Sequence, residues 1–135
     1  MGQKKKILIV DDERDIVKAV MIRLQGAGYD VVTAFDGAQG VFMAHKEKPD
    51  LIILDIRMPA GNGFSVAQRL KRSMHTFTIP VIFLTGSPEK NAEKKAMALG
   101  ARFYIKKPYD PEELLDAVKR ALEKDVDPNS GQRND

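Results

Sequence analysis

Five short apolar segments are spaced along the chain, each rich in Val, Ile, Leu or Phe. They cover residues 7–10, 31–34, 51–54, 81–84 and 103–105. Several are apolar at every position, which is typical of parallel strands that are buried on both faces. Successive segments begin between 20 and 30 residues apart, which leaves room for a helical crossover each time. The pattern therefore predicts five strands of one parallel sheet.

Helical signals are clearest after the first strand and after the last one. The first helix has one apolar stripe, and Gly26 with Gly28 is expected to end it; the stripe consists of Ile16, Val17, Val20, Met21 and Leu24. Before the last helix, Asp110 and Pro111 have the character of an N-cap residue and a first-turn proline. Its buried face is expected at Leu114, Leu115, Val118, Ala121 and Leu122.

Three further helices are predicted on weaker signals, two of them over residues 38–47 and 63–73. The third is expected to open at Ser87, with Pro88 and Glu89 in its first turn. Its apolar stripe is thin, so it should be the most weakly held helix; the stripe consists of Ala92, Ala96 and Leu99. Five strands alternating with five helices predict an α/β fold in which helices cover both faces of a parallel sheet.

Composition fits one ordinary folded domain in a chain of 135 residues, 43% of them hydrophobic and 30% charged. We expect the domain over residues 1–124 and a polar tail or truncated linker over 125–135. The chain has no Cys, which excludes disulfides, zinc–thiolate sites and thiol catalysis. Apolar runs of four residues are too short to span a membrane, and we expect a soluble, cytoplasmic protein with no membrane partner.

The net charge of +3 raises the question of nucleic-acid binding. Such binding needs Lys and Arg concentrated on one face, whereas here many of them alternate with acids, as over residues 89–95. Direct nucleic-acid binding by this domain is therefore not expected.

Polar side chains follow four of the five predicted strands: Asp11 and Asp12, then Asp55, Thr85 and Lys107. In an open α/β sheet the ligand site lies beyond the carboxyl ends of the strands, so these side chains should meet at one edge. Three carboxylates so close together repel one another and need a cation, and hard oxygen ligands suit Mg²⁺. With a divalent cation and Lys107 present, the formal charges balance.

This set of residues is suited to attack by a carboxylate on a phosphoryl group. Asp55 would be the nucleophile and would form an aspartyl phosphate. The metal would neutralise developing charge, and Lys107 and the Thr85 hydroxyl would bind phosphoryl oxygens. Taken singly, the same residues have plainer explanations: Asp12 could cap a helix, and Tyr104 could simply pack in the core.

Four motifs in order make the chain resemble the receiver domain of two-component response regulators. They are Val-Asp-Asp-Glu over 10–13, Leu-Asp-Ile-Arg-Met-Pro over 54–59, Thr-Gly over 85–86, and Gly-Ala-Arg-Phe-Tyr-Ile-Lys-Lys-Pro-Tyr over 100–109. The resemblance covers about residues 5–124. It implies a doubly wound, flavodoxin-like (βα)5 sheet with the strand order 2-1-3-4-5.

The resemblance also implies metal and phosphate ligands. Asp11 and Asp12 are similar to the family's acidic pair, with Asp12 the more direct Mg²⁺ ligand. Asp55 corresponds to the phosphoacceptor, and the backbone carbonyl of Arg57 to a further metal ligand. Lys107 rather than Lys106 matches the family's lysine because it precedes Pro108, and the resemblance implies a cis peptide bond between the two.

The implied function is a switch in phosphorelay signal transduction and not a turnover enzyme. A sensor histidine kinase or a phosphotransfer protein would supply the phosphoryl group, and the receiver would assist its own phosphorylation and dephosphorylation. Thr85 and Tyr104 resemble the switch pair. They would alter the face formed by the fourth helix, the fifth strand and the fifth helix, which an output domain or protein, or a second copy of the chain, would bind.

The sequence departs from the family pattern in two places. Residues 58–63 are Met-Pro-Ala-Gly-Asn-Gly, where relatives often have Met-Pro-x-Met-Asp-Gly; Asn62 can still form the turn. Arg57 and Ser87 stand two positions after Asp55 and Thr85, where the family tunes the lifetime of the phosphate.

Two other functions remain open on the sequence. A phosphohydrolase with an aspartyl-phosphate intermediate would commonly need a second Asp two residues after the nucleophile, where this chain has Arg57. A binding module could use the same fold without phosphorylation, although the complete set of polar residues argues against it. His45 and His75 have no partners at ligand spacing, so neither is expected in the site.

Overall fold

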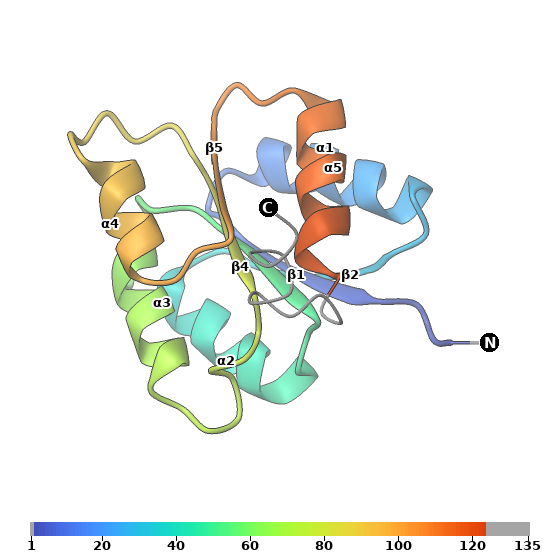
Figure 1. Cartoon of the computed structure of the whole chain (residues 1–135), viewed down its shortest axis with the longest axis horizontal. Helices are drawn as coiled ribbons and strands as arrows, with labels where there is room; N and C mark the ends of the chain where they lie inside the picture. The colour runs from blue at the N-terminus through green and yellow to red at the C-terminus, as the bar shows by residue number, and fades with distance from the viewer. Residues whose placement is uncertain (1, 124–135) are drawn as a thin grey trace, which may run out of the picture.

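The computed structural model describes residues 2–123, in which strands and helices alternate (Figure 1). The expected tail over 125–135 lies outside the described residues. In chain order the elements are β1 (Lys6–Val10), α1 (Arg14–Gly26), β2 (Asp30–Ala34), α2 (Gly37–Glu47), β3 (Leu51–Leu54), α3 (Gly63–Lys71), β4 (Val81–Thr85), α4 (Ala92–Ala98), β5 (Phe103–Lys106) and α5 (Pro111–Ala121).

The five strands form one parallel sheet in the order β2-β1-β3-β4-β5, as predicted. The order reverses direction between β1 and β3, which is the switch point of the fold. In the register of these two strands Val10 is opposite Leu54. The residues that follow, Asp11 and Asp55, therefore leave the sheet side by side.

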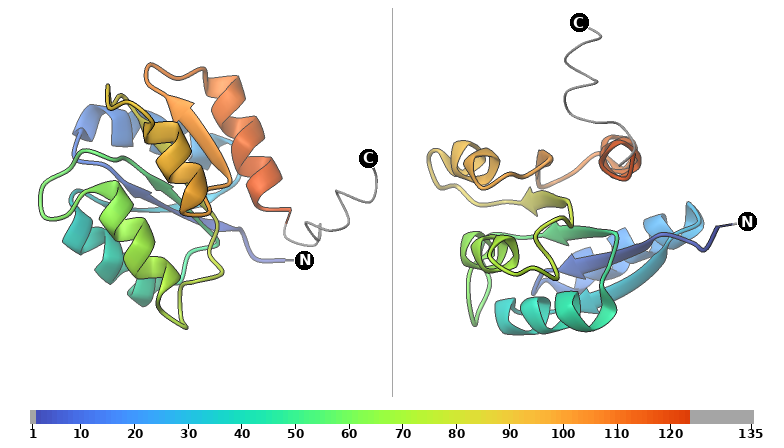
Figure 2. Two further views of the ribbon diagram at one scale, coloured as in Figure 1. Left: turned by 60° about the vertical axis from the view of Figure 1, so that its left-hand side comes forward. Right: turned by 60° about the horizontal axis from the view of Figure 1, so that its bottom comes forward.

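Helices cover both faces of the sheet, with α1 and α5 on one side and α2, α3 and α4 on the other (Figure 2). Alternate residues of β1 face opposite layers: Ile7 and Ile9 pack with α1 and α5, and Leu8 and Val10 pack with the other three helices. Each fully buried side chain of this size contributes about 1.5–3 kcal/mol. Burial on both faces explains why the strands are apolar at nearly every position.

The helix α4 begins at Ala92, so the expected opening at Ser87 is wrong. The Ser87 hydroxyl does accept a hydrogen bond from the Glu89 backbone N–H at 3.2 Å, which resembles the bond from Glu112 to the Asp110 carboxylate at α5. The two segments then differ, because Asn91 has a φ of +65° and interrupts any helix before Ala92. The local signal marks a turn here, and the helix follows it.

The helix α3 ends at Lys71, two residues before the expected end. Its start is fixed by Asn62, whose side chain accepts a hydrogen bond from the Ser65 backbone N–H at 3.0 Å. Asn62 thus keeps its turn-forming role, although the loop departs from the family pattern.

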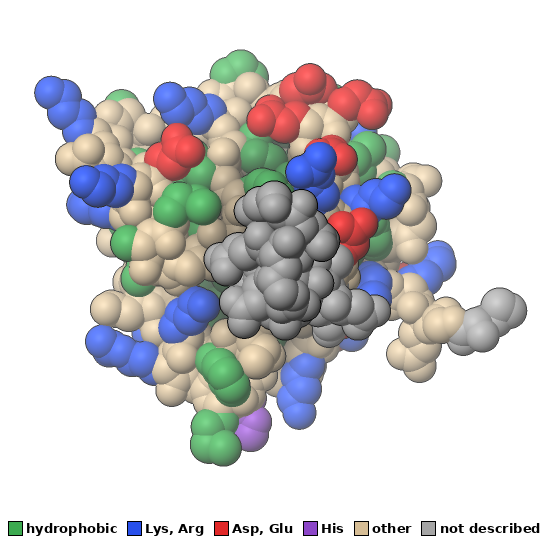
Figure 3. Space-filling view, viewed as in Figure 1, with side chains coloured by type: hydrophobic (Ala, Val, Ile, Leu, Met, Phe, Trp, Pro, Cys, Tyr) green, Lys and Arg blue, Asp and Glu red, His purple; other side chains and the backbone are tan. Residues whose placement is uncertain are grey.

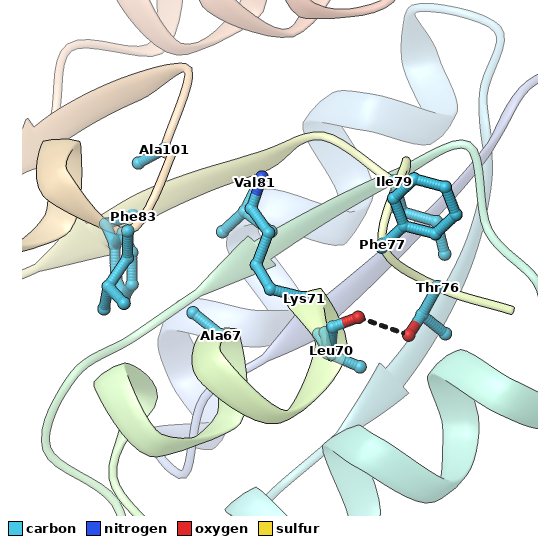
Figure 4. A pocket seen from close by; sticks show the side chains of 10 residues that line it. Ala67, Leu70, Lys71, Thr76, Phe77, Ile79, Val81, Phe83 and Ala101 are labelled. Atoms are coloured by element: carbon cyan, nitrogen blue, oxygen red, sulfur yellow. Dashed lines mark hydrogen bonds between the residues drawn. The ribbon is translucent and has the colours of Figure 1, made fainter. Parts of the chain in front are cut away.

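A small cavity lies between α3 and β4, away from the ends of the strands that carry the polar residues (Figure 4). Its volume is about 10 Å³, enough for about one water molecule. Beside it, the Thr76 hydroxyl donates a hydrogen bond of 2.7 Å to the Leu70 carbonyl, which satisfies a buried polar group. The lining is otherwise mostly apolar, and the cavity is a packing defect too small for a ligand.

Candidate functional site

Three carboxylates meet at the carboxyl ends of β1 and β3. Asp11 and Asp55 are buried and Asp12 is exposed, and each offers an oxygen within 4.8 Å of the others. Backbone hydrogen bonds fix this position, since the Asp55 N–H donates to the Val10 carbonyl at 3.0 Å. The sequence-predicted acidic cluster is thus assembled by the strand register.

Lys107 reaches the same cluster from the end of β5. Its ammonium group donates to Asp11 Oδ2 at 2.8 Å, to Glu13 Oε1 at 2.6 Å and to Asp55 Oδ2 at 3.3 Å. Its backbone N–H donates to the Thr85 carbonyl at 2.9 Å, and its peptide bond to Pro108 is cis. Lys107 therefore lies in the cluster, whereas the neighbouring Lys106 is exposed on the surface.

The electrostatics of the cluster are unbalanced without a cation. Burial raises the pKa of Asp11 to about 6, against the lowering effect of hydrogen bonds from Lys107 and from the Glu13 backbone N–H, and the charge of Asp55 adds to the increase. Burial acts to lower the pKa of Lys107, but hydrogen bonds to Asp11 and Glu13 outweigh it and raise that pKa above its usual value. A single ammonium thus faces several carboxylates.

The donor set fits a hard divalent cation. Three carboxylate oxygens lie close enough to share one ion, and oxygen donors of this kind are those that Mg²⁺ takes in proteins. The observed cluster therefore agrees with the magnesium site that the sequence predicts.

Thr85 and Tyr104 lie on one face of the sheet, on the neighbouring strands β4 and β5. Thr85 is buried, and its hydroxyl oxygen accepts a hydrogen bond from the Ser87 backbone N–H at 3.2 Å. Tyr104 is opposite Phe83 and is only partly buried. Burial raises the pKa of Tyr104, and the charges of Glu93 in α4 and of Asp55 in the acidic site add to the increase.

An open cleft brings most of the site residues to one surface, but Asp11 and Tyr104 do not line it. Its lining includes the sequence-predicted residues Asp12, Asp55, Arg57, Thr85, Ser87 and Lys107. Glu13 also lines it and was not predicted as a site residue. The position of Glu13 directly after the acidic pair could have indicated a role in the site. Acidic residues are common at the start of helices, however, so this position alone does not predict such a role.

The loop between β3 and α3, which carries Arg57, is held by close backbone packing. The Gly63 N–H donates to the Ile56 carbonyl at 2.7 Å, and the Gly37 N–H at the start of α2 donates to the Pro59 carbonyl at 3.1 Å. A Cβ atom at Gly63 would overlap the carbonyl oxygen of Asp55. The glycine is therefore required for the loop to approach Asp55 so closely.

The two histidines lie outside this cleft, as expected. His45 in α2 contacts the Val41 carbonyl through Nδ1 at 3.0 Å and the Ser73 hydroxyl through Nε2 at 3.1 Å. The His75 ring packs edge-on against His45 with 6.4 Å between centroids. Both therefore belong to the packing near the ends of α2 and α3.

A family model described as the response regulator receiver domain matches residues 7–119. The chain belongs to this family, and its function is that of a receiver in two-component signalling, which is a signalling switch and not a classical enzyme.

Curated relatives agree with this assignment. The chain is 39% identical over 133 residues to the alkaline phosphatase synthesis transcriptional regulatory protein PhoP of Bacillus subtilis, covering 97% of this chain and 55% of that protein. It is 43% identical over 117 residues to the DNA-binding dual master transcriptional regulator RpaA of Synechocystis, covering 87% of this chain and 48% of that protein. The chain thus spans about half the length of the curated relatives it matches.

Solved structures show the same fold. The chemotaxis response regulator CheY4 of Vibrio cholerae matches with a TM-score of 0.82 and 34% identity, covering 89% of this chain and all of that one (100%). A response regulator of Chloroflexus aurantiacus matches with a TM-score of 0.84 and 32% identity, covering 89% and 98% of the two chains. Within residues 2–123, no helix has the length and apolar character needed to cross a membrane.

Proposed function

We propose that Asp55 accepts a phosphoryl group from the phosphohistidine of a sensor histidine kinase or of a phosphotransfer protein. An Asp55 carboxylate oxygen attacks phosphorus while the P–N bond of the donor breaks, and the electron pair remains on the imidazole nitrogen. The observation that carries this proposal is the cluster of Asp55 with Asp11, Asp12 and Lys107, beside an open cleft that Asp12, Asp55 and Lys107 line.

Different residues around Asp55 stabilise different parts of the transferred phosphoryl group. Lys107 donates to one phosphoryl oxygen and the Thr85 hydroxyl to another, since both line the cleft beside Asp55. Asp11, Asp12, Asp55 and the Arg57 backbone carbonyl would hold Mg²⁺. When bound, the ion neutralises charge that develops on the phosphoryl oxygens.

Phosphorylation changes the interactions of Thr85. In the unphosphorylated protein the Thr85 hydroxyl oxygen accepts from the Ser87 backbone N–H, and its own O–H can donate to the phosphoryl group at the same time. Because Ser87 stays bonded to Thr85, a turn of Thr85 toward the phosphoryl group draws the start of the β4–α4 loop inward. Tyr104, partly buried on the adjacent strand, fills the space that Thr85 leaves. The result is a population shift at the face formed by α4, β5 and α5.

That face is where an output domain or protein, or a second copy of the chain, would bind. On the side of the molecule seen in Figure 3, acidic side chains gather near the start of α5, where Glu112 and Glu113 lie, and basic side chains are spread over α3 and α4. The basic residues form no single patch in this view. Nucleic-acid binding by this domain is therefore not proposed.

The proposed extent of the domain is residues 1–124, and a cytoplasmic location is our expectation. PhoP and RpaA are transcriptional regulators by name, and the chain matches about half of each. A transcriptional output outside this chain is therefore the candidate that the relatives favour.

The two other functions are less well supported. A phosphohydrolase would need an acid–base carboxylate two residues after Asp55, and the group there is the exposed Arg57. A binding module without phosphorylation would not need Lys107 to contact both Asp11 and Asp55 at the edge of an open cleft.

The proposal is tested by incubating the protein with acetyl phosphate and Mg²⁺ and measuring its intact mass. We expect the wild-type protein to gain one phosphoryl group and the Asp55→Asn protein to gain none. Equal labelling of both proteins would show that Asp55 is not the acceptor. Absence of labelling in the wild type would favour the binding module.

A further inference from the structure

Glu13 makes the shortest contact in the site, although it lies outside the group of carboxylates that could share a metal. Its Oε1 is 2.6 Å from Lys107 Nζ, compared with 3.3 Å for Asp55 Oδ2. Its backbone is fixed as well, because its N–H donates to Asp11 Oδ1 at 2.9 Å. Glu13 therefore stands where Lys107 enters the site and draws the ammonium group toward the start of α1.

The hydrogen-bonding capacity of Lys107 is fully used in this state. An ammonium group has three N–H donors, and Asp11, Glu13 and Asp55 each accept one. A phosphoryl oxygen can gain a bond from Lys107 only if one of these acceptors gives up its own.

The exposure of the acceptor side chains indicates which of them loses its hydrogen bond from Lys107. The Asp11 side chain is 4% exposed, so losing its partner would leave a buried carboxylate unpaired. The Glu13 side chain is 58% exposed, so water can replace Lys107 there at small cost. The Asp55 side chain is 6% exposed and stays beside Lys107 when it carries the phosphoryl group, so the bond from Lys107 to Glu13 is the one to be exchanged.

We propose that Glu13 is a positioning residue: it binds the ammonium group of Lys107 in the unphosphorylated protein and competes with the phosphoryl group for it. This inference rests on the phosphoacceptor function proposed above. The negative charge of Glu13 also repels the incoming anionic group, so its competition and its charge act in the same direction. Glu13 thus biases the protein toward the unphosphorylated state.

The test is the Kd of beryllofluoride, an analogue of the phosphoryl group, measured by isothermal titration calorimetry at saturating Mg²⁺. We expect Glu13→Gln to lower this Kd about two- to fivefold, the range for one exposed ion pair. A merely structural role would be expected to weaken binding on substitution, so the direction of the change is diagnostic. The Glu13→Asp protein, which keeps the charge but shortens the reach, should also bind more tightly than the wild type.

The matched control is Asp15→Asn, since Asp15 is an exposed acid in the first turn of α1, two residues after Glu13, and its side chain makes no hydrogen bond or ion pair among the described residues. Its Kd should equal that of the wild type. An unchanged or higher Kd in Glu13→Gln, an equal gain in Asp15→Asn, or wild-type binding in Glu13→Asp would overturn the inference. A wild-type protein that binds no beryllofluoride, or an Asp55→Asn protein that binds it equally well, would overturn the proposed function too.

Discussion

Arg57 and Ser87 both line the cleft of the proposed phosphorylation site, and we expect both to affect the lifetime of the phosphate. Phosphorylation converts the Asp55 carboxylate into a group with about one more negative charge. The guanidinium of Arg57 is suited to pair with phosphoryl oxygens, and Ser87 has no carboxylate or amide to position an attacking water. We therefore expect both residues to favour slow hydrolysis.

The first prediction is that the double variant Arg57→Asn, Ser87→Glu loses its phosphoryl group faster than the wild type. The variant removes the guanidinium group at position 57 and adds a carboxylate at position 87 that can position an attacking water. Decay is followed after removal of the phosphodonor, by the loss of phosphorylated mass over time. Equal or slower decay in the double variant would contradict this account of the two residues.

The second prediction concerns Asp12, the exposed member of the acidic cluster. Because Mg²⁺ would bind the folded cluster and relieve repulsion, it should raise the Tm; at a concentration of 100 Kd the gain is about 2.7 kcal/mol. Asp12→Ala should remove most of this gain. The measurement is thermal unfolding with Mg²⁺ and with a chelator, and Asp15→Asn serves as the control that keeps the full gain. An equal Mg²⁺ response in Asp12→Ala would exclude Asp12 as a ligand.

At the residue scale, strand ends predicted which side chains would meet. The positions of Asp11, Asp55 and Lys107 were predicted from the rule that parallel strands end at the same edge of the sheet. In the structure the carboxylates of Asp11 and Asp55 are both within hydrogen-bond distance of Lys107 Nζ. The contact of Glu13 with Lys107 could not be predicted in this way. This contact depends on the direction in which one long side chain points, and the hydrophobic periodicity of the sequence does not specify that direction.

At the scale of elements, the helix α4 combines a short length with little buried surface. It has seven residues, no side-chain hydrogen bond at its N-cap, and only Ala92 and Ala96 buried. The helix α5 has 11 residues, a capping Asp110 and four buried residues. This contrast agrees with the expectation from the thin apolar stripe that α4 is the most weakly held helix.

The third prediction is that backbone amides of α4 exchange with solvent faster than those of α5. Few buried contacts allow local opening at a lower free energy than global unfolding. Hydrogen–deuterium exchange of the unphosphorylated protein, read by mass spectrometry of peptides, gives both rates in one experiment. Protection of α4 equal to that of α5 would contradict the prediction.

The fourth prediction concerns the loop that joins β3 to α3. Gly63→Ala should reduce the free energy of unfolding by about 1–3 kcal/mol, because the added methyl group overlaps the Asp55 backbone. Gly26→Ala at the end of α1 is the control, since no atom lies within 4 Å of the added Cβ there; it should be neutral or slightly stabilising. Urea unfolding of both variants measures the difference. A neutral Gly63→Ala would mean that the loop can move away from Asp55.

The start of α4 shows where prediction of elements from sequence fails. Ser87-Pro88-Glu89 and Asp110-Pro111-Glu112 carry the same kinds of residue, and both make the same local hydrogen bond. Only the second continues directly into a helix, because Asn91 adopts a positive φ in the first. A left-handed residue depends on how the loop closes against the rest of the molecule, which a local pattern does not specify.

At the scale of the whole molecule, the strand order required more than the hydrophobic pattern. Continuous apolar strands with helical crossovers predicted a parallel sheet covered on both faces, but several strand orders satisfy that description. The order 2-1-3-4-5 came from the resemblance to receiver domains, and the structure has it. That order matters for function because it places β1 beside β3 and so puts Asp11 next to Asp55.

The central claim, that Asp55 is the phosphoacceptor, is tested most directly by locating the acyl phosphate in the chain. After phosphorylation with acetyl phosphate and Mg²⁺, borohydride reduces an aspartyl phosphate to homoserine, and peptide mass spectrometry identifies the altered position. The account predicts homoserine at position 55 and unmodified Asp11 and Asp12. Homoserine at either of those two positions, or at none, would contradict it.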